Sequence, residues 1–472
     1  MSFPRIVIAG VHSGAGKTTV ATALMRALSL GGMKVQPYKV GPDYIDPGYH
    51  TAATGRCSRN LDVWMLGGDG VREMFLRSAP GADISVIEGV MGLYDGRWST
   101  DEGSTAHVAR LLRAPVLLVM DARSMARSAA AVVRGYRDFD PEVNLCGVIL
   151  NRVGSERHFR MLTEAIESAT GVPVLGRMGY NSGAELPERH LGLLPTAEKD
   201  GLGRLLDLLA REIREGVDLG RLVSLAGSAP EPPRPEKTVF PEVARDSQVR
   251  IGLVRDSAFN FYYQDGLDLL SALGAELVTF SSLEGRLPPG LDGLYLGGGF
   301  PEVFAGQIAA NIELMDSVRE ACGQGMPVYA ECGGMMFLSR GVTGFDGVRH
   351  AMAGVIPGET VMLKKRAGLG YVTAVSAGDS ILAPAGRELR GHEFHYSVMR
   401  EGDLSSPAYF LKKAGEGEAR PDGYSNGSIL ASYLHINFAG CPREAENFIN
   451  SCLRHRSRRN GKGQAEGSAI RL

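Results

Sequence analysis

Long hydrophobic runs are absent from this sequence, and their absence excludes the usual signature of a membrane-spanning chain. No apolar stretch approaches the roughly 18 residues that a transmembrane helix needs. The N-terminal run Ile6–Ala9 is also far too short for the core of a signal peptide. We therefore expect a cytoplasmic protein that has no membrane partner.

Cysteine and net charge are also scarce. The chain of 472 residues has 6 cysteines, which show neither the paired spacing of a metal site nor the density of a disulfide framework. Its formal net charge of -2 provides no field that would attract nucleic acid. A small-molecule partner is therefore favoured, and each cysteine is considered singly, as a buried apolar residue or as a nucleophile.

The chain is too long for a single hydrophobic core, because cores stop growing at roughly 250–300 residues. Over residues 1–225, short β-branched runs alternate with helical patterns, which predicts βα units around a parallel sheet. The proline-rich stretch 226–248 is typical of an extended linker. The βα rhythm resumes over 249–453, which predicts a second α/β domain, and the basic segment 454–472 is expected to be a flexible tail.

A phosphate-binding loop is predicted in Gly10–Thr19, between the first strand and the first helix. Its glycines let backbone N–H groups surround phosphates, its lysine neutralises their charge, and the helix adds the positive end of its dipole. The first glycine is one residue away from the commonest spacing, and a glycine-rich turn is the alternative interpretation. The residues assigned to ATP binding are Gly14, Gly16, Lys17, Thr18 and Thr19.

Two acidic clusters follow later strands, at the sheet edge where α/β proteins bind ligands. The first contains Lys39, Asp43 and Asp46, although Pro-Asp and Asp-Pro-Gly are also ordinary turn sequences. The second begins with Glu88, directly after an apolar strand, where phosphate-loop enzymes keep a further magnesium ligand. The alternative for this glutamate is a cap of the next turn. The predicted Mg2+ ligands are Thr18, Asp43 and Glu88.

The second domain contains a candidate nucleophile, Cys332, which follows a predicted strand and precedes two glycines. Small residues permit the sharp turn of a nucleophile elbow. His435 is the candidate base, and Gly298 and Gly299 offer backbone N–H groups for an oxyanion hole. An inert core thiol is the alternative for the cysteine. Asn437 stands where a carboxylate could have oriented the imidazole, so another group must do this, or the base is oriented less strongly.

His392 and His395 have a spacing that could suit metal ligands on one helix face. Their aromatic and β-compatible neighbours instead favour a strand or turn near the active site. We therefore expect a structural or substrate-lining role for both.

Taken together, these residues make the sequence resemble the a,c-diamide synthases of corrinoid biosynthesis, above all the cobyrinate a,c-diamide synthases, along nearly its whole length. The matching phrases are Lys39–Pro47, Arg59–Asp62, Glu88–Gly96, Leu186–Pro195, Asp256–Tyr263 and Tyr329–Gly334.

This resemblance implies a dethiobiotin-synthetase-like P-loop domain, with a parallel sheet flanked by helices, joined to a class I glutamine amidotransferase domain of the cobyric-acid subtype. That subtype lacks the usual glutamate after the histidine, so Asn437 fits it. The resemblance makes Cys332 the nucleophile and His435 the residue that raises its nucleophilicity. It further implies that ATP phosphorylates side-chain carboxylates of cobyrinate and that ammonia from L-glutamine displaces the phosphate, first at c and then at a.

Candidate substrate contacts also lie in the matching phrases, although single basic residues near turns are as often surface charges. These candidates are Lys39, Tyr44, Asp46, Arg59 and Asp95. The two separate chemical clusters also lead to the hypothesis of an ammonia tunnel between the domains. Because α/β enzymes of this size commonly pair, a homodimer is a candidate assembly.

Three alternatives remain open at this point. Hydrogenobyrinate and nickel-sirohydrochlorin present acetate side chains similar to those of cobyrinate. A nucleotide-switch ATPase of the partitioning type also begins with a shifted phosphate loop, but such loops normally carry an early lysine where this sequence has Val11 or His12. A switch ATPase would also leave the domain around Cys332 unexplained.

Overall fold

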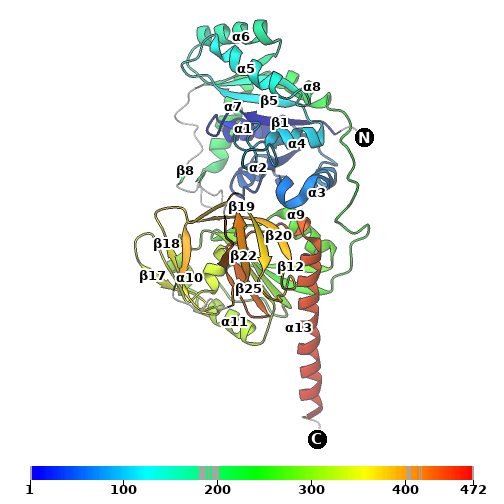
Figure 1. Cartoon of the computed structure of the whole chain (residues 1–472), viewed down its shortest axis with the longest axis vertical. Helices are drawn as coiled ribbons and strands as arrows, with labels where there is room; N and C mark the ends of the chain where they lie inside the picture. Colours follow the sequence, from blue (N-terminus) through cyan, green and yellow to red (C-terminus); the bar gives the residue numbers. More distant parts are fainter. Residues whose placement is uncertain are drawn as a thin grey trace. The chain divides into compact units, whose positions relative to one another are not determined.

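The computed structural model describes residues 3–179, 188–189, 192–193, 201–400, 406–413, 415 and 417–469. The chain divides into two compact units, Met1–Thr238 and Val239–Leu472 (Figure 1). The matching phrase at 186–195 lies largely outside the described residues.

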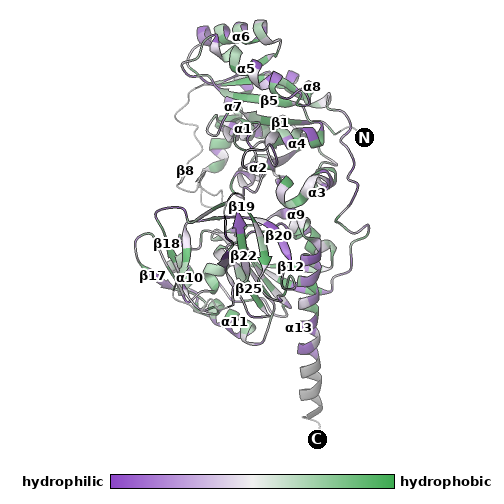
Figure 2. Ribbon diagram, viewed as in Figure 1, coloured by the Kyte–Doolittle hydropathy of each residue, from purple (hydrophilic) through white to green (hydrophobic). Residues whose placement is uncertain are grey.

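The first unit is built on a seven-stranded sheet with the order β3-β2-β4-β1-β5-β6-β7, in which every pair is parallel. The strands are β1 (Arg5–Gly10), β2 (Val35–Val40), β3 (Arg59–Leu61), β4 (Ile84–Glu88), β5 (Val116–Asp121), β6 (Leu145–Val153) and β7 (Val174–Gly179). Parallel strands covered on both faces need nearly continuous apolar sequences, and Figure 2 shows hydrophobic residues along β1 and β5.

Helices connect these strands, and β8 (Glu188–Arg189) pairs antiparallel with β9 (Gly192–Leu193). The helices are α1 (Lys17–Leu30), α2 (Asp46–Thr54), α3 (Val63–Ser78), α4 (Thr105–Leu112), α5 (Ser128–Phe139), α6 (Glu156–Thr170), α7 (Leu202–Gly216) and α8 (Leu219–Gly227). The predicted parallel sheet flanked by helices is confirmed. Its strand-to-helix loops after β1, β2 and β4 lie at one edge, because parallel strands end on the same side.

The second unit contains a six-stranded sheet with the order β12-β10-β13-β15-β25-β24, parallel except for the last pair. Its strands are β10 (Val249–Val254), β12 (Ala275–Phe280), β13 (Gly293–Leu296), β15 (Val328–Glu331), β24 (Tyr424–Ser425) and β25 (Ile429–Ser432). Its helices are α9 (Gln264–Ala272), α10 (Ala305–Ala310), α11 (Ile312–Gly323), α12 (Gly333–Leu338), η2 (Phe438–Gly440) and α13 (Pro442–Ala469). The predicted second α/β domain is therefore confirmed.

Smaller sheets complete this unit: β11 pairs with β14, and two four-stranded sheets have the orders β17-β16-β18-β21 and β20-β19-β22-β23. Their strands are β11 (Phe259–Phe261), β14 (Gly298–Gly299), β16 (Gly341–Thr343), β17 (Arg349–Ala351), β18 (Glu359–Met362), β19 (Gly368–Ser376), β20 (Glu388–His395), β21 (Ser397–Arg400), β22 (Tyr409–Lys413) and β23 (Arg420–Asp422).

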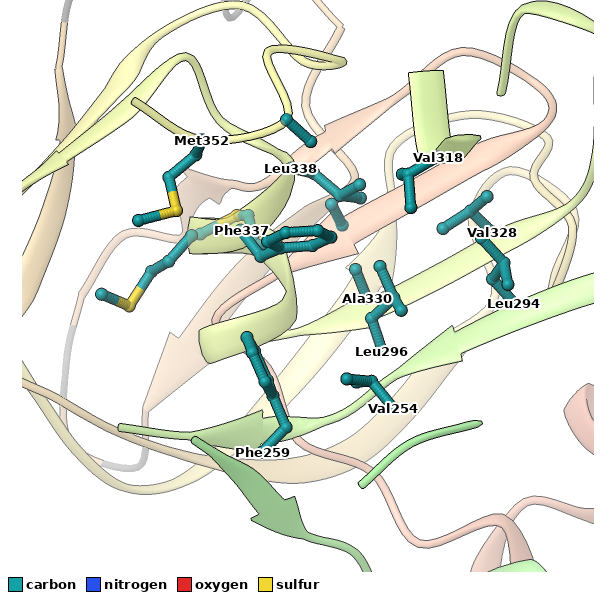
Figure 3. Close-up of a cluster of buried hydrophobic side chains, with 14 of the residues drawn as sticks. Val254, Phe259, Leu294, Leu296, Val318, Val328, Ala330, Phe337, Leu338 and Met352 are labelled. Atoms are coloured by element: carbon teal, nitrogen blue, oxygen red, sulfur yellow. The ribbon is translucent and has the colours of Figure 1, made fainter. Parts of the chain in front are cut away.

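The core of the second unit fixes the position of α12, the helix that follows the candidate nucleophile. Side chains from alternate positions of β13 and β15, such as Leu296 and Ala330, lie in one buried cluster with Phe337 and Leu338 of α12 (Figure 3). Because successive side chains of a strand point to opposite faces, the other residues of β13 and β15 face away from this cluster.

The predictions for the linker and for the C-terminal segment differ in outcome. Residues 228–248 form neither helix nor strand, as expected of a proline-rich linker. The expected flexible tail from 454 onward is instead part of α13, which extends to Ala469. Arg459 anchors it, because its guanidinium donates to Leu291 O at 2.6 Å and pairs with Asp292 at 2.7 Å.

Across the described part of the chain, no helix has both the length and the hydropathy needed to cross a membrane.

Replacing Leu296 by alanine tests the contribution of this core. Leu296 is 0% exposed, and removing a fully buried leucine leaves a cavity that costs about 2–5 kcal/mol of unfolding free energy. Leu369→Ala is the matched control, since Leu369 is 48% exposed in the same unit. Calorimetric melting should show a clear loss for Leu296→Ala and little change for the control. Equal losses would contradict the assignment of this core.

Candidate active site

The loop between β1 and α1 has the backbone of a phosphate cradle. Gly14 and Gly16 have φ values of 83° and 97°, a region that residues with a side chain rarely adopt. Gly16 immediately precedes α1, so the unpaired N–H groups of the first helical turn are available to a ligand in the loop. Thr18 and Thr19 lie in that turn.

Lys17 is held over this loop by packing. A Cβ on Gly10 would lie 2.8 Å from Lys17 Cγ and 3.1 Å from its Nζ, so only glycine at position 10 leaves room for the lysine. The shifted first glycine therefore has a steric role. Lys17 Nζ donates to His12 O at 3.3 Å. Burial, and then repulsion from Lys39, lowers the pKa of Lys17 to about 8, and an anion in the loop would favour its charged form.

A buried cluster of charged groups lies beside the loop. Lys39 Nζ contacts Asp46 Oδ2 at 2.5 Å and Glu88 Oε1 at 2.8 Å. His50 Nε2 contacts the other oxygen of Glu88 at 2.6 Å. The hydroxyl of Thr18 donates to Glu88 Oε1 at 2.6 Å and to Asp46 Oδ2 at 3.3 Å. The cluster therefore joins the phosphate loop to the ends of β2 and β4.

In this cluster, the opposite charges of Lys39 and Glu88 offset the effect of burial on each other's pKa. Burial alone would raise the pKa of Glu88, but Lys39 and His50 hold the pKa of this carboxyl well below its usual range. Burial alone would lower the pKa of Lys39, but Asp46 and Glu88 keep it above its ordinary value. Burial and then the charge of Asp43 raise the pKa of Asp46. Glu88 and Lys39 are therefore ionised inside the protein.

The two aspartates of the first acidic cluster have different surroundings. Asp46, predicted as a substrate contact, faces Thr18 and Lys39. Asp43, predicted as a metal ligand, accepts from the backbone N–H groups of Ile45 at 2.7 Å and Asp46 at 3.1 Å. Its Oδ1 therefore holds the turn that leads into α2.

The remaining sequence-predicted residues of this unit lie in neighbouring segments. Asp95 accepts from Gly92 N at 2.8 Å and so fixes the loop after β4. Tyr44 lies in the turn before α2, and Arg59 opens β3. Sequence reasoning missed His50, although its position one helical turn after Asp46 places both on one face of α2. It also missed Asn151, whose side chain donates to Ala15 O of the phosphate loop at 3.0 Å.

The donor set beside the loop fits a magnesium ion that is shared with phosphates. Such an ion takes one or two protein oxygens and completes its shell with phosphate and water, and Thr18 Oγ1, Glu88 and Asp46 supply oxygens at this position. Within the described ranges, no group of at least three His, Cys, Asp or Glu residues could hold a metal ion by itself. The residues therefore suit a nucleotide-bound ion and not a closed metal cage.

In the second unit, Cys332 lies in a strained turn between β15 and α12. Its φ is 47° and its ψ is -100°, an unfavourable backbone conformation for a residue with a side chain. Its N–H donates to Ser432 O of the neighbouring strand at 2.7 Å. The turn is closely packed, since a Cβ on Gly333 would lie 3.1 Å from Gly299 N. These features match the predicted nucleophile elbow.

The same turn brings the other predicted residues together. His435 is held by backbone hydrogen bonds with His392, at 2.8 Å from His435 N to His392 O and at 3.0 Å in the reverse direction. A Cβ on Gly298 would lie 2.7 Å from His435 Cε1. Gly299 therefore packs against the elbow, and Gly298 packs against the imidazole. Burial, and then the charge of Glu302, raises the pKa of the Cys332 thiol, so this thiol needs a base to become a nucleophile.

His392 and His395 do not form a metal pair. Both belong to strand β20, where residues three positions apart point to opposite faces. The His392 ring stacks on His435 at 5.1 Å, and the His395 ring stacks on Tyr433 at 3.8 Å. Burial, followed by repulsion from His435, holds the pKa of His392 well below its usual value. The neutral His392 ring therefore supports His435 from one side.

Two further residues complete the surroundings of the imidazole. Asn437 accepts from Ala439 N at 3.0 Å and caps η2. Sequence reasoning missed Glu331, the residue before the elbow, whose carboxylate lies beside the His435 ring. The only signal for Glu331 in the sequence is its position at the end of a buried strand. From the sequence, a carboxylate that orients the imidazole was expected after His435, at position 437.

Replacing Lys39 by methionine tests the buried charge cluster. Removing one partner of a buried ion pair leaves an uncompensated charge and costs about 3–5 kcal/mol. Lys34→Met, an exposed position on the same segment, is the control. Because the pKa of Glu88 is depressed in the folded state, the loss should be full near neutral pH. It should shrink as the pH falls below the unfolded carboxyl value of about 4.3. Calorimetric melts that show no such pH dependence would contradict this.

Comparison with known proteins matches most of each unit. Residues 6–194 match the family model described as a CobQ/CobB/MinD/ParA nucleotide binding domain, and residues 250–442 match a CobB/CobQ-like glutamine amidotransferase domain. The chain is 46% identical over 456 residues to a cobyrinate a,c-diamide synthase of Dehalococcoides mccartyi strain CBDB1, covering 95% of this chain and 98% of the relative.

Two further relatives are similar to the same degree. The chain is 45% identical to a cobyrinate a,c-diamide synthase of Priestia megaterium, over 96% of this chain and 98% of that protein. It is 44% identical to a hydrogenobyrinate a,c-diamide synthase of Streptomyces coelicolor, over 95% of this chain and 97% of that protein.

Proposed function

This chain belongs to the cobyrinate a,c-diamide synthase family, and we accordingly propose that it converts the a and c side-chain carboxylates of cobyrinate into amides, with ATP and L-glutamine as co-substrates. The resemblance predicted from the sequence is thereby confirmed, and the chain is a glutamine-hydrolysing carbon–nitrogen ligase of cobalamin synthesis. One observation supports the proposal most. The chain combines a phosphate loop joined to a buried carboxylate with a cysteine elbow packed against Gly298 and Gly299, the first of which also contacts the His435 ring.

In the first unit, the proposed task is activation of a carboxylate. A carboxylate is a poor acyl donor, and transfer of the ATP γ-phosphoryl group to it creates a good leaving group. Gly14, Gly16 and Thr19 would cradle the phosphates with their backbone N–H groups, while Lys17 neutralises charge. A Mg2+ ion held by Thr18 and Glu88 would neutralise the phosphate oxygens.

The remaining residues of this edge have proposed roles that follow from their contacts. Asp46 is placed to assist Thr18 and Glu88, and Asp43 stays a predicted ligand whose Oδ1 already holds the turn. Lys39 forms ion pairs with two carboxylates, Asp46 and Glu88. Its proposed effect on the substrate is therefore indirect, through the positions of these two side chains. Tyr44, Arg59 and Asp95 remain predicted substrate contacts.

In the second unit, the proposed task is release of ammonia from glutamine. The Cys332 sulfur attacks the side-chain amide carbon of glutamine while its proton passes to His435. The N–H groups of Gly298 and Gly299 would stabilise the oxyanion. His435 then gives the proton to the departing ammonia, which leaves a thioester at Cys332. Water hydrolyses this thioester, so that glutamine and water yield glutamate and ammonia.

The two reactions are coupled through the nitrogen. Ammonia attacks the acyl phosphate and phosphate leaves, so each amide is accompanied by one ADP and one phosphate. Free ammonia is mostly protonated near neutral pH and the ammonium ion cannot attack. We therefore propose that ammonia released in the second unit is consumed in the first without equilibrating with solvent.

A second candidate substrate is hydrogenobyrinate, because the relative that carries this name in Streptomyces coelicolor is 44% identical to the chain. Transfer of nitrogen-15 from labelled glutamine to each macrocycle, with ATP present or omitted, distinguishes the two candidates. ATP-dependent labelling of cobyrinate is the expected result. Labelling of hydrogenobyrinate alone would reassign the substrate, and labelling of neither would overturn the proposal.

Replacing Cys332 by serine separates the two tasks. The variant should lose glutamine-driven synthesis by about 100-fold or more, because a serine hydroxyl is a much weaker nucleophile than a thiolate. It should retain ammonia-driven synthesis, which needs only the first unit. Lys17→Ala is the complementary control and should lose both activities. Loss of ammonia-driven synthesis in Cys332→Ser would indicate that the thiol is structural.

A further inference from the structure

Glu331, the last residue of β15, is a buried carboxylate beside the proposed base. It is 0% exposed. Its Oε1 accepts from the Tyr329 hydroxyl at 2.6 Å and from Ile436 N at 3.0 Å, and its Oε2 accepts from the Tyr295 hydroxyl at 3.0 Å. Oε2 also lies 3.7 Å from His435 Nδ1. The carboxylate is therefore fixed through both oxygens, with one of them facing the imidazole.

These surroundings suit an ionised carboxylate. A buried carboxylate is costly unless hydrogen-bond donors compensate its charge, and three donors converge on Glu331. Burial, and then the negative charge of Glu331, raises the pKa of both Tyr295 and Tyr329. Both hydroxyls therefore keep their protons and donate them. An apolar residue at position 331 would need none of these hydrogen-bond donors. The presence of a carboxylate there therefore calls for a functional explanation.

The position of Glu331 also selects the tautomer of His435. A negative charge beside Nδ1 favours a proton on that nitrogen, which leaves Nε2 with the lone pair that a base needs. The Cε1 edge of the ring faces Gly298, and His392 stacks on its face. The ring is therefore held by contacts on three sides, and its Nδ1 faces the carboxylate.

We propose that Glu331 is a positioning residue of the glutaminase reaction, which orients His435 through Nδ1 and stabilises the imidazolium formed when Cys332 transfers its proton. This inference rests on the proposed glutaminase function. It assigns the orienting task to the residue before the nucleophile, whereas Asn437 accepts a hydrogen bond that caps η2.

The distance of 3.7 Å indicates when this interaction acts. It exceeds the length of a hydrogen bond, yet a charge–charge attraction across it is strong in a buried site of low dielectric. The carboxylate therefore acts most strongly on the imidazolium that forms when Cys332 transfers its proton to His435. The proton that Cys332 gives up resides on His435 Nε2 until it leaves with ammonia, so Glu331 itself stays unprotonated. An interaction made only in the transition state changes kcat and leaves KM unaltered.

Glu331→Gln tests the charge, because glutamine keeps the shape of the side chain. For glutamine hydrolysis, kcat should fall about 100-fold or more, as when the carboxylate that orients a catalytic histidine is neutralised, with KM for glutamine unchanged. Glu331→Asp should recover part of this loss. Ammonia-driven synthesis, which needs only the first unit, should be unaffected in both variants, and the unchanged KM for glutamine shows that the second unit is folded.

A matched pair of tyrosine variants tests the geometry with the carboxylate in place. Tyr295→Phe removes the donor to the oxygen that faces His435, whereas Tyr329→Phe removes a donor to the other oxygen. Tyr295→Phe should lower kcat for glutamine hydrolysis about tenfold, consistent with losing a hydrogen bond to a charged group. Tyr329→Phe should have a clearly smaller effect. This pair remains informative if the Glu331 variants do not fold.

Several outcomes would overturn the inference. One is a Glu331→Gln variant whose kcat stays within about threefold of the wild type, since an orienting charge is worth far more. Another is a rise in KM that accounts for the whole loss, and a third is equal effects of the two tyrosine variants. Failure of the wild-type chain to hydrolyse glutamine would instead refute the proposed function.

Discussion

Both candidate sites depend on a carboxylate that is buried at the end of a central strand. Glu88 ends β4 and Glu331 ends β15, and both are 0% exposed. A charge in such a place is tolerated only when neighbours compensate it, and the neighbours that do so include the chemically active groups. Glu88 is compensated by Lys39, His50 and Thr18. Because each buried carboxylate needs hydrogen bonds and ion pairs to offset its desolvation, it holds the side chains around it in defined positions.

Glycine has the complementary task at the same sheet edges. At position 10 it leaves room for the lysine of the phosphate loop, and at position 298 it leaves room for the His435 ring. Position 333 allows the elbow to approach the backbone of Gly299. Side chains at these places would separate groups that must lie within a few ångströms of each other. The sites are thus defined as much by missing Cβ atoms as by functional side chains.

The sequence predicted the parts of the molecule that local patterns determine. The phosphate loop and the elbow are contiguous segments with their own backbone signature, and the βα rhythm predicted both sheets. The pairing of Asp46 with Thr18 and of Glu331 with His435 could not be read in this way, because it depends on strand order and on which face a residue takes. The helical state of the segment after 454 was missed for a related reason, since Arg459 finds its acidic partner far away along the chain.

The left-handed backbone at Cys332 has an evolutionary implication. Glycine adopts such a conformation without strain, so Cys332→Gly would relieve the backbone strain of the elbow. Backbone strain alone would therefore not favour a cysteine at this turn. Its presence is consistent with a compromise in which the protein accepts backbone strain in exchange for a thiol at this turn.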